Sequence, residues 1–97
     1  MDSRILTLKP NKFFVGKYFE EVKANLKKVN ENTEDFGTAL YLNYPDYFIV
    51  VDEMYTLEVY YTETLNDVNQ KISLIESIIR DRIRNFRFDK SKMNFIN

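Results

Sequence analysis

The feature that most constrains the fold is residues 37–62, which contain three strand-like runs separated by short breaks. Residues 55–62 alternate apolar and polar side chains with a period of two, which is typical of a strand with one buried face. Residues 47–51 are apolar on both sides, which is typical of a central strand, and residues 38–43 form the third run. Asn43-Tyr44-Pro45-Asp46 is a strong turn signal. The short connections predict an antiparallel meander with residues 47–52 in the middle.

Helical patterns flank this stretch on both sides. Residues 12–30 carry apolar side chains at helical spacing, with Gly16 weakening the first turn. Residues 30–35 are polar and acidic, which predicts a loop leading into the meander. Residues 64–86 carry an unbroken apolar stripe, and Thr64 with Asp67 three residues later resembles a capping box. Residues 4–9 have the pattern of a short strand, and the tail 88–97 that of a small terminal strand or a docking arm. The order (β)αβββα predicts one two-layer α+β domain over residues 1–97, with two helices packed on a meander of three strands, or four with the N-terminal one.

Composition excludes several chemistries. The chain has no Cys and no His, so it offers no thiolate, no imidazole base and no common zinc ligand set. Two isolated glycines cannot form a phosphate-binding loop. We therefore expect no catalytic residue, no cofactor and no metal, and a protein that is not an enzyme. No apolar run approaches the ~20 residues that span a membrane, and no signal peptide is evident, so the expected location is cytoplasmic.

Carboxylates and aromatic side chains remain as candidates for function. Seven Tyr and eight Phe in 97 residues are many. Tyr on a solvated sheet face is common at recognition surfaces; the alternative is ordinary packing by residues of high β-propensity. For the carboxylates, the alternative to a functional role is that they are ordinary turn residues or lie on the solvent-exposed face. Phe14, Phe19, Phe48 and Phe86 are most simply assigned to the core. The candidate partner-binding residues are Tyr44, Asp46, Asp52, Glu53, Glu58 and Tyr60.

Charge is partitioned along the chain, although the net charge is only −1. Residues 29–70 carry nine acidic and no basic side chains, whereas residues 1–28 and 71–97 each carry seven basic and three acidic ones. Such asymmetry is informative about partners. The first hypothesis is a small binding protein that docks its acidic, Tyr-rich sheet region on a basic surface of a partner protein. If that surface normally holds nucleic acid, the protein is an inhibitor. It is similar in size and charge to anti-CRISPR and anti-restriction proteins, and this analogy implies a phage or mobile-element protein.

Two other hypotheses stay open. The element order resembles that of double-stranded-RNA-binding domains, but Glu63 and Asp67 stand where those domains carry basic residues, and phosphates would be repelled by the acidic sheet. Nucleic acid is therefore a less favoured partner. A nucleic acid would bind the basic end of the second helix. The plainer interpretation of this basic segment is a solvated helix end. That basic face consists of Arg80, Arg82, Arg84 and Arg87. The last hypothesis is a self-associating structural subunit, such as a homodimer.

Overall fold

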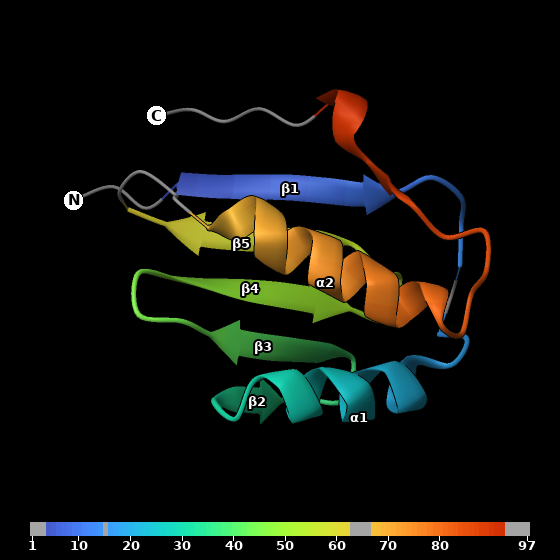
Figure 1. The fold of residues 1–97 in the computed structure, drawn as a ribbon, viewed down its shortest axis with the longest axis horizontal. Coiled ribbons are helices and arrows are strands. Elements are labelled where there is room, and N and C mark those ends of the chain that lie inside the picture. Colours follow the sequence, from blue (N-terminus) through green and yellow to red (C-terminus); the bar gives the residue numbers. More distant parts are fainter. Residues whose placement is uncertain (1–3, 15, 63–66, 93–97) are drawn as a thin grey trace.

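The computed structural model describes residues 4–14, 16–62 and 67–92. Its elements are strand β1 (Arg4–Pro10), helix α1 (Phe19–Val29), strands β2 (Thr33–Asp35), β3 (Ala39–Asn43), β4 (Tyr47–Asp52) and β5 (Leu57–Tyr61), helix α2 (Val68–Arg80), strand β6 (Phe88–Asp89) and a short 3-10 turn (Lys90–Lys92). The strands form one antiparallel sheet in the order β2-β3-β4-β5-β1-β6. Figure 1 shows the two helices lying across this sheet.

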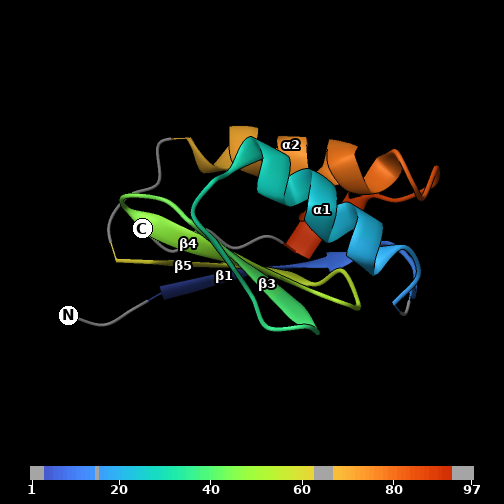
Figure 2. The ribbon, with the colours of Figure 1, turned by 90° about the horizontal axis from the view of Figure 1, so that it is seen from below.

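The molecule has two layers, with both helices on the same face of the sheet (Figure 2). Strand side chains alternate between the two faces, so every second residue of the central strands points at the helices. In β4, for example, Ile49 and Val51 are fully buried. The core consists of these inward residues and the apolar stripes of the helices: Leu6, Leu8, Phe19, Val22, Leu26, Leu40, Leu42, Tyr47, Ile49, Val51, Tyr55, Leu57, Val59, Tyr61, Val68, Ile72, Ile75, Ile78, Ile79, Ile83, Phe86 and Phe88. Among the described residues, no helix lies on the opposite face of the sheet.

The predicted α+β class, meander and pair of helices are confirmed. β4 lies between β3 and β5, as the short connections indicated. The N-terminal strand also exists, and it pairs with β5 from Arg4 opposite Tyr61 to Leu8 opposite Leu57. Two short edge strands extend the sheet beyond the predicted four. β6 realises the predicted terminal strand over two residues, and the remainder of the tail from residue 93 lies outside the described residues.

The predicted loop at residues 30–35 is corrected, because Thr33–Asp35 forms β2 along the edge of β3. An ionic contact fixes this edge to α1. The buried ammonium of Lys23 lies 3.0 Å from Asp35 Oδ1 and 2.9 Å from Glu20 Oε2, and it donates a 2.8 Å hydrogen bond to the Gly37 carbonyl. Burial alone would lower the pKa of Lys23, but the two carboxylates raise it above its ordinary value. Sequence periodicity could not reveal this strand, since its three residues are all polar.

Both helices are shorter than their patterns. α1 begins only at Phe19, because Gly16 and Tyr18 adopt positive φ angles of 61° that a helix cannot contain. α2 ends at Arg80, whose Nε donates a 3.2 Å hydrogen bond back to the Phe86 carbonyl. The chain between them turns tightly, and this turn carries Ile83 and Phe86 into the core. The proposed capping residue Thr64 lies outside the described residues, and Asp67 makes no side-chain cap bond.

Phe48 is a correction to the predicted core. Its neighbours Tyr47 and Ile49 are buried on the helix side, so alternation places Phe48 on the uncovered face of the sheet, where it is half-buried. Phe19 and Phe86 are core residues as predicted, and Phe14 packs against the core.

Candidate protein-binding surface

The uncovered face of the sheet brings together outward side chains from four strands. The register places Asn43 of β3 beside Phe48 of β4, Phe48 beside Tyr60 of β5, and Tyr60 beside Ile5 of β1. The next row along β4 is formed by Val50, opposite Tyr41 and Glu58. These rows belong to one surface because residues two apart on a strand share a face.

Four rings form a continuous row across this surface, which we call the aromatic stripe: Phe36, Tyr41, Phe48 and Tyr60. Successive ring centroids lie 4.9, 5.7 and 4.7 Å apart, and the last two pairs are stacked with interplanar angles of 11° and 6°. Phe36 stands at one end with 63% of its surface exposed, and Ile5 continues the row beyond Tyr60 with 52% exposed. Stacking fixes these rings in place, so a partner would meet a preordered apolar surface.

Two carboxylates flank the aromatic stripe. Glu34 lies opposite Tyr41 on the adjoining edge strand, and Glu58 lies two residues before Tyr60 on β5. Within the described part of the chain, neither glutamate forms an ion pair. Burial raises the pKa of the Tyr60 hydroxyl, and the nearby Glu58 raises it further. We call the stripe with Glu34 and Glu58 the acidic aromatic face.

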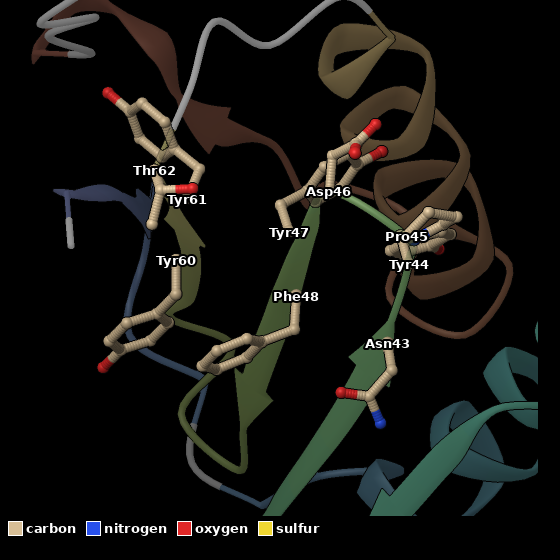
Figure 3. Close-up of a pocket in the computed structure, with 9 residues that line it drawn as sticks. All are labelled: Asn43, Tyr44, Pro45, Asp46, Tyr47, Phe48, Tyr60, Tyr61 and Thr62. Carbon is tan, nitrogen blue, oxygen red and sulfur yellow. The ribbon is translucent and has the colours of Figure 1, made fainter. Parts of the chain in front are cut away.

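A shallow cavity of about 300 Å³ lies where β3 turns into β4, beside the end of the aromatic stripe. Figure 3 shows the side chains that line it, with the Phe48 and Tyr60 rings side by side. Its lining is Asn43, Tyr44, Pro45, Asp46, Tyr47, Phe48, Tyr60, Tyr61 and Thr62. The turn thus brings together three of the candidates from sequence, namely Tyr44, Asp46 and Tyr60.

One wall of this cavity is anchored to the helix layer. The Tyr44 and Tyr47 rings stack with centroids 5.0 Å apart, and the Tyr47 hydroxyl donates a 2.9 Å hydrogen bond to Asp67 just before α2. Burial raises the pKa of Tyr47 far above its ordinary value, and the Asp67 carboxylate adds to this effect. Lys71 of α2 places its ammonium 5.2 Å from the centre of the Tyr44 ring. Tyr47 is therefore a structural residue, while Tyr44 stays half-buried at the cavity.

Asp52 is the last residue of β4, and Glu53 follows it in the turn to β5, at the end of these strands away from the cavity. Asp52 Oδ1 accepts 3.0 Å hydrogen bonds from the backbone N–H groups of both Met54 and Thr56, which is a turn-capping role. The Glu53 backbone accepts a 2.8 Å hydrogen bond from Gly16 and donates one of 2.9 Å to Thr38. The structure therefore separates these two candidates from the cavity that brings Tyr44, Asp46 and Tyr60 together.

The four arginines of the predicted basic face also separate. Arg80 is committed to the fold, with Nη2 2.7 Å from Glu76 Oε1. Arg82, Arg84 and Arg87 are exposed beyond the end of α2. Arg82 and Arg84 line a cavity of about 260 Å³ together with Lys12 and Lys17 from the segment before α1. The sequence did not predict this grouping, because about 70 residues separate the two lysines from the two arginines.

Sequence reasoning missed Phe36 and Glu34 as members of the acidic aromatic face, because Glu34 lies within the predicted loop and Phe36 directly follows it. The period-two signal of β3 and β5 could have placed Tyr41 and Tyr60 on the same face of the sheet once the register was known. In the described ranges, no group of three acidic side chains is placed to hold a metal ion. Nor is any described helix long and apolar enough to cross a membrane. Comparison of the chain with protein-family models, curated proteins and solved structures found no match.

Proposed function

We propose that this protein is a small, non-catalytic binding module whose acidic aromatic face docks on a basic surface of a partner protein. The observation that supports it is a preordered row of partly exposed rings on the uncovered sheet face, flanked by carboxylates that have no ion-pair partner in the described chain. Tyr and Phe are enriched at the centre of protein interfaces.

The chemistry of the face selects the partner's residues. An arginine guanidinium can stack on an aromatic ring while it hydrogen-bonds a neighbouring carboxylate. Tyr60 and Glu58 offer that combination on one strand, and Tyr41 and Glu34 offer it across a strand pair. A partner surface that carries two or more arginines would therefore meet two matching positions on the acidic aromatic face.

Such a basic surface commonly serves to hold nucleic acid. A protein that covers it with carboxylates competes with the phosphates, so the module would act as an inhibitor. The analogy in size and charge to anti-CRISPR and anti-restriction proteins fits this role, and it would make the chain a phage or mobile-element protein.

Two pairs of substitutions with the same change in net charge test the proposal. The partner is first isolated by affinity capture from the native host, and its dissociation constant is then measured by calorimetry. Glu34→Lys with Glu58→Lys alters the acidic aromatic face, whereas Glu21→Lys with Asp81→Lys alters exposed positions in the helix layer. We expect the first pair to weaken binding by at least about tenfold at low salt, and by less at high salt.

A second pair tests the rings without changing charge. Phe36→Ser with Tyr41→Ser removes one end of the aromatic stripe, and we expect a loss of about tenfold or more that persists at high salt. Circular dichroism serves as the folding control for all variants. The proposal fails if the helix-layer pair weakens binding as much as the sheet-face pairs, or if Arg82→Glu with Arg84→Glu abolishes binding while the sheet-face variants retain it.

A further inference from the structure

Two segments far apart in the sequence meet at the end of the molecule where α1 begins and α2 ends. Figure 1 and Figure 2 both show the chain before α1 beside the chain after α2. Asn11 joins them: its backbone N–H donates to the Arg87 carbonyl at 2.7 Å, its Oδ1 accepts from the Arg87 N–H at 3.0 Å, and its Nδ2 donates to the Asn85 carbonyl at 3.2 Å. Phe14 packs on Phe86 beneath, with ring centroids 5.7 Å apart.

This junction gathers four cations, which we call the cationic cluster: Lys12, Lys17, Arg82 and Arg84. All four line the 260 Å³ cavity, and no carboxylate lines it with them. None of the four forms an ion pair with a described carboxylate, although Lys23, Lys27, Arg80 and Lys90 all do. Like charges repel, so four unpaired cations held at one cavity favour an anionic ligand.

The backbone holds the cluster in place. The Gly16 N–H donates a 2.8 Å hydrogen bond to the Glu53 carbonyl, and the buried Tyr55 hydroxyl donates one to the Lys17 carbonyl. Tyr18 takes a left-handed conformation with φ of 61°, which is uncommon for an aromatic residue. These contacts fix the direction of the chain on both sides of Lys17 before any ligand binds.

Exposed rings accompany the cations. Tyr18 lines the cavity with 41% of its surface exposed, and the Lys17 ammonium lies 5.5 Å from the centre of its ring. Phe13 does not line this cavity, but it is 76% exposed and lines a second cavity that shares Lys12 with the first. Proteins that bind single-stranded nucleic acids combine a positively charged groove with aromatic side chains, because phosphates bind the cations and unpaired bases stack on the rings. In a duplex the bases are paired and stacked, so the rings could not reach their faces.

We infer that the cationic cluster, with Tyr18 and Phe13, is a binding site for a short segment of single-stranded nucleic acid. The site lies on the helix side, at the end of the molecule away from the turn between β3 and β4. The inference does not rest on the proposed docking of the sheet face, which involves other residues.

Fluorescence anisotropy with a labelled thymidine oligonucleotide of about 15 nucleotides tests the inference directly. If four phosphates are neutralised, the affinity falls about 50-fold between 50 and 200 mM salt. Arg82→Glu with Arg84→Glu should weaken binding by at least about tenfold and reduce the salt dependence. The matched control is Lys28→Glu with Lys71→Glu, which makes the same charge change outside the cluster and should leave the affinity within about twofold.

Two further arms separate stacking from simple attraction to phosphate. Tyr18→Asn removes the ring but keeps a residue that tolerates the left-handed conformation, and Phe13→Ser removes the other exposed ring. We expect each to weaken oligonucleotide binding by about fivefold or more, without altering the weaker competition by inorganic tripolyphosphate. A duplex of the same length should bind less tightly than the single strand.

Several results would overturn the inference. The first is absence of saturable binding at 50 mM salt. The second is an equal loss of affinity in the cluster variant and in the matched control. The third is an unchanged affinity in both ring variants, combined with tripolyphosphate binding as tightly as the oligonucleotide, since this would reveal a site for phosphate alone. Circular dichroism of each variant excludes unfolding as the cause of any loss.

Discussion

Asp35 is a single residue that links the two layers at the edge of the sheet. Its carboxylate lies 2.8 Å from Lys27 Nζ and 3.0 Å from Lys23 Nζ, and it accepts a 2.9 Å hydrogen bond from the Gly37 N–H. Lys27 above all, with the Gly37 N–H and Lys23, holds the pKa of Asp35 well below its ordinary value. A carboxyl with a depressed pKa in the folded state stabilises that state above its unfolded pKa of about 3.9, and this contribution is lost as the pH falls.

We therefore expect the urea midpoint of unfolding to decrease between pH 5 and pH 2. Asp35→Asn should lower the midpoint at pH 7, because it removes the charge that the lysines contact, and should make the midpoint less sensitive to acid. Glu31→Gln, an exposed position close by, is the control and should leave the acid dependence unchanged. An Asp35→Asn variant with the same pH profile as the original chain would contradict this account.

Tyr55 has the opposite dependence on pH. Its ring is fully buried against Phe19 and Phe86, and its hydroxyl donates to the Lys17 carbonyl. Burial raises the pKa of Tyr55 to about 12, and the charge of Glu21 adds to this effect. A raised pKa stabilises the fold below the unfolded value of about 10, and this stability is lost as the pH rises through 12.

Alkaline titration, followed by tyrosinate absorbance and circular dichroism together, should show a late ionisation that coincides with unfolding. Tyr55→Phe should lower the stability at pH 7 by about 1 kcal/mol through loss of the hydrogen bond. It should also weaken the alkaline dependence, while Tyr47 keeps part of it because its pKa is raised as well. If the variant unfolds over the same alkaline range and its stability falls as steeply with pH, the burial of the Tyr55 hydroxyl does not contribute to alkaline unfolding.

At the scale of elements, the stripe of α2 is the part of the fold that periodicity predicts best. Ile75 and Ile79 are buried, whereas Ser77 is exposed between them. Ile75→Asp should destabilise the protein by about 4 kcal/mol or more, because it buries an unpaired charge, and Ser77→Asp should cost less than about 1 kcal/mol. Denaturant unfolding measures both, and similar costs for the two substitutions would contradict the assignment of helix faces.

Two carboxylates near the turn between β4 and β5 have different roles, because Asp52 caps the turn and Glu58 lies on the sheet surface. Asp52→Lys removes the acceptor of two backbone hydrogen bonds, so we expect a loss of about 1–2 kcal/mol. Glu58→Lys on the neighbouring strand leaves backbone bonds untouched and should cost less than about 0.5 kcal/mol. Thermal unfolding of the two variants gives this comparison, and an equal shift in Tm would show that the capping bonds contribute nothing. Charge alone, read along the sequence, could not tell these two residues apart.

The elements differ in how well the sequence predicts them. The meander and α2 were predictable because each repeats one period over many residues. β2 and β6 are too short for a period, and each exists through its pairing with β3 or β1. The aromatic stripe depends on register, which the sequence leaves open until the strands pair. The cationic cluster depends on the bonds of Asn11 across the fold, for which no local pattern exists.

At the scale of the whole molecule, the fold converts a partition of charge along the chain into two separate surfaces. Some of the acidic stretch is neutralised, since Asp35 pairs with Lys23 and Lys27. The remainder includes Glu34 and Glu58 on the sheet face, whereas the cationic cluster lies where α1 begins and α2 ends. The two surfaces lie on opposite sides of the two-layer fold, whose shortest dimension is 20 Å, more than twice the Debye length of about 8 Å at physiological salt.

Two sites separated in this way should bind their ligands independently. At 0.15 M salt, a saturating thymidine oligonucleotide should change the affinity for the protein partner by less than about twofold, because charges on opposite sides of the two-layer fold are screened from each other. Likewise, Glu34→Lys with Glu58→Lys should leave oligonucleotide affinity within about twofold, and Arg82→Glu with Arg84→Glu should do the same for partner affinity. Calorimetry with each ligand in the presence and absence of the other measures both directions. Coupling of tenfold or more at this salt concentration would mean that the two ligands compete for one surface, and the separation of acidic and cationic faces would then not describe how the molecule binds.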